Sequence, residues 1–78
     1  MTDTTRDASA RIAQLEKRLA DAQAKSTRAA ERRAALPPGS SRARVTTANA
    51  NWARAAEHRD RCAEELEAAR AGAARRQA

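Results

Sequence analysis

Apolar and small residues recur along the first half of the chain at alternating steps of four and three. This gives an average period of 3.5 residues, the repeat of helices that pack as coiled coils. The pattern predicts a helix over about residues 5–36. Its buried seam is formed by Ala8, Ile12, Leu15, Leu19, Ala22, Ser26, Ala29, Arg33 and Leu36.

The second half repeats the pattern and predicts a second helix over about residues 45–72. Gly72 and the arginines behind it predict a frayed tail at 73–78. Alanine weakens the signal because it is so frequent that it matches almost any frame. The second seam is formed by Val45, Ala48, Trp52, Ala55, Arg59, Cys62, Leu66, Ala69 and Ala73.

A Pro-Pro-Gly sequence separates the two patterns and predicts a chain reversal at about residues 37–44. Pro37 ends the preceding helix, and Gly39 permits the backbone of a turn. The start of the second helix stays open between Ser41 and Thr47, because several Ser and Thr residues there are candidate caps. The predicted fold is all-α, an antiparallel two-helix hairpin forming a single domain over residues 1–78.

The two seams also predict a register. If the chain reverses near residue 40, the numbers of facing residues sum to about 81, which places Trp52 opposite Ala29. Arg18 then falls near Glu65, and Glu16 comes within reach of Arg70. Each of these exposed pairs contributes only about 0.2–1 kcal/mol. The predicted core or interface consists of Ile12, Leu15, Leu19, Leu36, Val45, Trp52, Cys62 and Leu66.

Composition changes this picture by showing how small the core is. The chain is 41% hydrophobic, but most of that is Ala, and neither Phe nor Tyr occurs. A large buried aliphatic side chain contributes about 1.5–3 kcal/mol, and Ala much less. A composition so charged and poor in large side chains also suits a disordered chain, and the periodicity favours the helices. We therefore expect the hairpin to form a homodimeric four-helix bundle or to dock on a larger protein.

Charge supplies the one functional clue. The net charge is +6, and the positive excess falls at the turn end of the predicted hairpin. Arginine and lysine there suit phosphate groups of duplex DNA or structured RNA. A surface that serves solubility alone explains the same composition. The candidate anion or nucleic-acid contacts are Lys25, Arg28, Arg32, Arg42, Arg44 and Arg54.

Candidate chemistry is sparse. His58 and Cys62 are the only residues of their kinds, and acidic residues around them are expected to form a solvated surface that pairs with arginine. We expect no catalytic site, cofactor, metal or small-molecule substrate. The single Cys favours a reducing, cytoplasmic location. Neither a signal peptide nor a membrane span is expected, because the sequence lacks the apolar run that each requires.

Two functions follow as hypotheses. The first is a small non-catalytic helical hairpin for interaction or oligomerisation, with itself or a larger protein as partner. The alternative is a basic nucleic-acid-binding regulator that uses the Arg-rich turn end. Duplex binding at low salt distinguishes them, since phosphate-driven affinity is strongest there.

Overall fold

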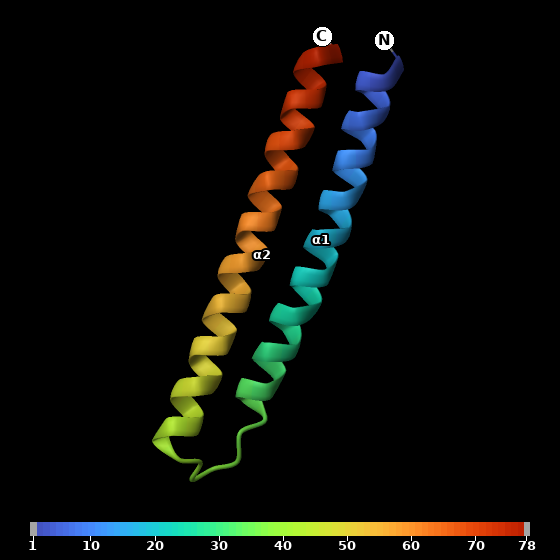
Figure 1. Cartoon of the computed structure of the whole chain (residues 1–78). Coiled ribbons are helices and arrows are strands. Elements are labelled where there is room, and N and C mark those ends of the chain that lie inside the picture. The colour runs from blue at the N-terminus through green and yellow to red at the C-terminus, as the bar shows by residue number, and fades with distance from the viewer. Residues whose placement is uncertain (1, 78) are drawn as a thin grey trace.

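The computed structural model describes residues 2–77 and consists of two long helices. Helix α1 spans Thr2–Ala34 and helix α2 spans Arg42–Gln77, and no strand occurs in the described range. The helices run antiparallel and side by side, so the start of α1 and the end of α2 lie together (Figure 1). The predicted all-α hairpin is therefore confirmed. Helix α2 continues past Gly72 through most of the segment predicted to fray.

The connection between the helices follows from its two prolines and one glycine. Pro37 has no N–H to continue the hydrogen bonding of α1, and the Leu36 N–H donates to the Arg33 carbonyl at 3.4 Å in a tighter, 3₁₀-like turn. Residues 37–40 then form a type II turn. Gly39 has φ of +84°, as the third position of that turn requires, and the Ser40 N–H donates to the Pro37 carbonyl at 3.1 Å.

Ser41 is the N-cap of α2. Its hydroxyl accepts a hydrogen bond from the Arg44 N–H at 3.2 Å, and its carbonyl accepts the first helical bond, from the Val45 N–H, at 3.1 Å. The bond to the hydroxyl satisfies one of the donors that every helix leaves free at its start. Helix α2 thus begins at Arg42, at the early edge of the range that the sequence leaves open.

The core is a narrow strip along the facing sides of the two helices. Leu15 is its most completely buried large side chain, 2% exposed, and Leu66 is 4% exposed. Ile12, Leu19 and Leu36 lie half-buried at the edges of the strip. Over residues 6–76, the buried side chains all belong to the two predicted seams; they are Leu15, Ala22, Ser26, Ala29, Cys62 and Leu66.

Val45 and Trp52, predicted to lie in the core or an interface, are not enclosed by the hairpin itself. Val45 is 39% exposed and Trp52 is 37% exposed. Two helices alone enclose only a thin strip, and its α1 side in this half of the rod is formed by small residues such as Ala29. An indole buries 150–250 Å² when enclosed, and no third helix is present to cover it. Trp52 therefore keeps its seam position but lies at the edge of the strip.

The predicted salt bridges between the helices are confirmed. Arg18 Nη1 lies 4.0 Å from Glu65 Oε2, and Arg70 Nη2 lies 3.6 Å from Glu16 Oε2. The residue numbers of these pairs sum to somewhat more than 81. Side chains on a helix lean towards its N-terminus, so in an antiparallel pair they meet beyond the positions where the backbones face each other.

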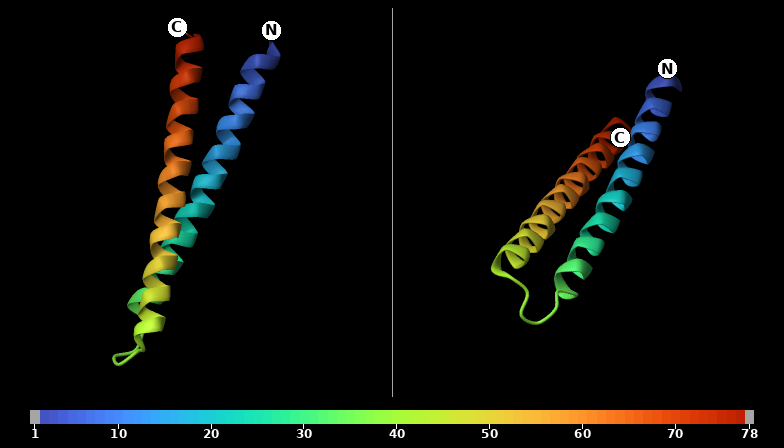
Figure 2. Two further views of the ribbon diagram at one scale, coloured as in Figure 1. Left: turned by 60° about the vertical axis from the view of Figure 1, so that its left-hand side comes forward. Right: turned by 60° about the horizontal axis from the view of Figure 1, so that its bottom comes forward.

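The molecule is a rod that measures 61 × 15 × 13 Å. Two further views show the helices lying along each other with no third layer over either side (Figure 2). The radius of gyration is 17.7 Å, against about 11.5 Å for a compact chain of this length. Both sides of the hairpin are consequently exposed along its whole length.

Candidate interaction surfaces

One column of α1 is entirely cationic. Arg11, Arg18, Lys25 and Arg32 follow one another at intervals of seven residues. Residues seven apart occupy the same position on the surface of a packed helix pair. The four side chains therefore project from the same side of the hairpin, one above the other.

Two shallow grooves show which residues of α2 share this side. The groove near the turn is lined by α1 residues on one wall and α2 residues on the other: Ala29, Arg32, Leu36, Ala43, Arg44, Thr47, Ala48 and Asn51. The groove at mid-length is lined by Arg18, Asp21, Ala22, Lys25, His58, Arg61, Cys62 and Glu65. Members of the cationic column occur in both grooves, so both open on the same side.

We call this side the basic face. The seven-residue repeat extends the positions of these groove residues along both helices, and nine cations occupy them. They are Arg11, Arg18, Lys25, Arg28, Arg32, Arg44, Arg54, Arg61 and Arg75.

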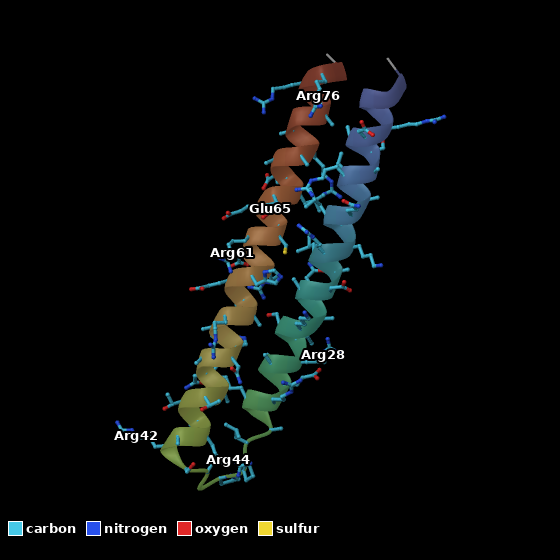
Figure 3. All side chains as sticks on the ribbon, in the orientation of Figure 1. Arg28, Arg42, Arg44, Arg61, Glu65 and Arg76 are labelled. Atoms are coloured by element: carbon cyan, nitrogen blue, oxygen red, sulfur yellow. The ribbon has the colours of Figure 1, made fainter. Side chains whose placement is uncertain are left out.

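Only three acidic residues share the basic face, namely Asp7, Asp21 and Glu65. The face therefore carries a net charge equal to the whole +6 of the protein, and the rest of the surface is balanced. Figure 3 labels three cations of this face, Arg28, Arg44 and Arg61, together with its carboxylate Glu65.

The basic face includes five of the six contacts predicted from the sequence. Lys25, Arg28, Arg32, Arg44 and Arg54 belong to it. Arg42 does not, because its position in the repeat places it on the opposite side of α2. The prediction also missed the cations farther from the turn. Counting charges by heptad position, instead of by chain segment, identifies these cations: Arg11, Arg18, Arg61 and Arg75.

The opposite side is lined mainly by small residues, and we call it the alanine-rich face. Its positions are exposed or half-buried, and its charged residues outside the seams balance, with three arginines against three carboxylates. Val45 and Trp52, the two exposed large apolar residues, lie at its inner edge. Its small residues are Ser9, Ala13, Ala20, Thr27, Ala30, Ala34, Thr46, Ala53, Ala56, Ala63 and Ala74.

The two arginines of the seams lie on this side. The Arg33 guanidinium sits over the Trp52 ring, 4.8 Å from its centroid, in a cation–π contact. Arg59 Nη1 donates to the Ser26 hydroxyl at 3.2 Å, and its Nε donates to Asp60 Oδ1 at 3.1 Å. Arg59 thus supplies a partner for the buried Ser26 hydroxyl while its own charge meets a carboxylate at the surface.

The only sulfur–histidine contact in the described chain joins Cys62 to His58. Cys62 Sγ lies 3.8 Å from His58 Nε2, one helical turn away. The thiol is buried, 6% exposed, and unpaired. The described residues contain no cluster of three or more His, Cys, Asp or Glu arranged to hold a metal ion. Neither helix, over residues 2–77, has an apolar stretch long enough to cross a membrane.

Comparison with protein families, with curated proteins and with solved structures gives no match to this chain.

Proposed function

We propose that this chain is a small non-catalytic interaction module that acts as a homodimer of helical hairpins. The observation that carries the proposal is the amount of surface the single hairpin leaves exposed. Its accessible surface is 6170 Å², whereas a compact protein of 8.4 kDa exposes about 4,600 Å². The rod shape accounts for this excess of about 1,500 Å², and a second rod alongside would cover much of it.

The alanine-rich face is the side on which the second hairpin docks. A stable interface buries about 800 Å² from each partner, less than the excess area. Small side chains allow helices to approach closely. The face also carries much less net charge than the basic face, because only the seam residues Arg33 and Arg59 add positive charge to an otherwise balanced set. Docking there also buries Val45 and Trp52, which the hairpin alone leaves exposed. The result is a four-helix bundle with Trp52 at the inter-hairpin seam.

A binding role suits the rest of the chain better than catalysis. Cys62 and His58 both line the mid-length groove, but the cysteine is only 6% exposed. Among the described residues His58 has no further hydrogen-bond partner to orient it as a base. The single cysteine fits a reducing, cytoplasmic location, which is part of the proposal.

Analytical ultracentrifugation tests the dimer. We expect a mass near twice 8.4 kDa at micromolar concentration, and a blue shift of the single Trp52 emission as the concentration rises through the dissociation constant. Trp52→Ala should weaken association by tenfold or more, because it removes the largest apolar side chain that the proposed interface would bury.

A matched pair of substitutions tests which face of the hairpin forms the dimer interface. Ala53 and Ala50 are both exposed on α2, but Ala53 lies on the alanine-rich face and Ala50 on the back of the helix. Ala53→Glu should abolish the dimer, whereas Ala50→Glu should preserve it, with equal helix content by circular dichroism. A folded monomer at 100 μM would overturn the proposed homodimer, and equal effects of the two substitutions would overturn the assignment of the face.

A further inference from the structure

The basic face contains cations that the fold does not use. Among the described side chains, no carboxylate lies within salt-bridge distance of Lys25, Arg28, Arg32, Arg44 or Arg61. Arg18 has only the long, exposed 4.0 Å pair with Glu65, which contributes little to stability. The face thus carries unpaired positive charge along the hairpin, on the side away from the proposed dimer interface.

The spacing of these cations suits a long, regular anion. Seven residues of helix rise about 10.5 Å, so the α1 column presents a positive group at that interval in a nearly straight line. The rod that carries it is 61 Å long. A globular acidic protein offers a patch, whereas a nucleic-acid duplex offers regularly spaced phosphates over any length.

The side chains also suit phosphate. Eight of the nine cations are arginines, whose planar fork can donate two hydrogen bonds to one phosphate group. Stacking on unpaired bases would need aromatic side chains. The single aromatic residue, Trp52, is on the other side of the hairpin, under Arg33. The face therefore fits a paired duplex better than a single strand.

From these observations we infer that the basic face binds the phosphate backbone of a nucleic-acid duplex without reading its sequence. This inference goes beyond the proposed homodimer and does not depend on it, because the two faces are on opposite sides of each hairpin. Duplex DNA and duplex RNA present the same chemistry, and the experiment below compares them.

The test is fluorescence anisotropy with labelled 30-base-pair DNA and RNA duplexes, the corresponding single strand, and poly-glutamate of similar charge. We expect either duplex or both to bind at 50 mM salt, with a plot of log K against log salt that falls with a slope steeper than about −4, as five or more neutralised phosphates require. A stronger interaction with one duplex identifies the natural source. Absence of duplex binding at low salt, or equal affinity for poly-glutamate or the single strand, would overturn the inference.

Two triple variants with the same change of charge locate the site. Lys25→Gln/Arg28→Gln/Arg61→Gln removes three cations from the basic face, and Arg6→Gln/Lys17→Gln/Arg42→Gln removes three from elsewhere; all six side chains are exposed. We expect the first variant to weaken binding at least tenfold and to make the salt slope shallower by about 2–3, one phosphate per cation. The second should change affinity less than threefold.

Equal losses in the two variants would show that net charge alone drives binding and would overturn the assigned face. The second variant contains Arg42, so its result also separates the basic face from the turn end as a whole. Helix content and sedimentation are measured on both variants. Ala53→Glu should lose the dimer and keep duplex binding. A wild-type chain that binds the duplex but sediments as a monomer would contradict only the proposed function.

Discussion

At the scale of single residues, a few seam positions near the middle and the open end of the rod hold the two helices together. Leu15 and Leu66 are buried almost completely, and Cys62 is only slightly more exposed, at 6%. The large residues nearer the turn are partly or largely exposed. The buried leucines lie in one half of the rod because large side chains from both helices meet only there.

Leu15→Ala should therefore be the most damaging truncation. It removes a side chain that is 2% exposed, and such changes cost about 2–5 kcal/mol. Leu36→Ala, the same substitution at a half-buried site, serves as the control and should cost less than half as much. Urea unfolding followed by helix content at 222 nm measures both. Equal losses of unfolding free energy in the two variants would contradict the difference in burial between Leu15 and Leu36.

At the scale of the elements, the residues that end and start the helices determine the hairpin. Pro37 stops α1, Gly39 supplies the positive φ of the turn, and Ser41 caps α2. The first turn of α2 contains no acidic residue, although acids are favoured there. Capping by Ser41 is therefore the main local interaction that fixes the start of this helix.

Removal of the Ser41 hydroxyl should destabilise the fold by about 1 kcal/mol, the usual cost of losing an N-cap. Thr46→Ala is the appropriate control, because Thr46 is exposed inside α2 and alanine there favours the helix. Thermal unfolding of Ser41→Ala and Thr46→Ala should shift the midpoint in opposite directions. A lower midpoint in both would indicate that the capping bond is not what distinguishes Ser41.

Physical reasons explain why the sequence predicts some features of the hairpin and not others. The period of 3.5 and the two prolines determine the helices, their order and the pairs Arg18–Glu65 and Glu16–Arg70. The exposure of Trp52 could not be predicted, because periodicity shows which side of a helix faces its partner but not how much space the pair encloses. The basic face was only partly predicted, because charge summed along segments does not resolve the two sides of a helix.

At the scale of the whole molecule, the hairpin separates its surface into two opposite sides. One side carries most of the net positive charge, and the other is lined by small residues, carries little net charge and is bordered by Trp52. If two copies dock through their alanine-rich faces, the two basic faces point outward in opposite directions. A dimer of this kind can hold one duplex on each side.

This arrangement predicts bridging of duplexes, a result that rests on both proposals together. Two duplexes labelled with a donor and an acceptor dye should show energy transfer when the wild-type chain is added at low salt. Ala53→Glu should bind each duplex but produce no transfer, since it exists as a single hairpin, whereas Ala50→Glu should bridge like the wild type. Transfer with Ala53→Glu equal to that of the wild type would contradict the two-sided dimer.

The position of the best-packed residues also affects how the chain folds. All contacts between α1 and α2 are nested around one turn, so pairs near Pro37 close a short loop, while bringing Leu15 to Leu66 first would close a loop of about fifty residues. Loop entropy makes that distal closure costlier by about 1.5 kcal/mol. Yet the buried leucines lie in the distal half, and exposed Val45 and Trp52 lie near the turn. Loop entropy thus favours helix pairing that starts at the turn, whereas the buried contacts that stabilise the paired helices form only towards the open end.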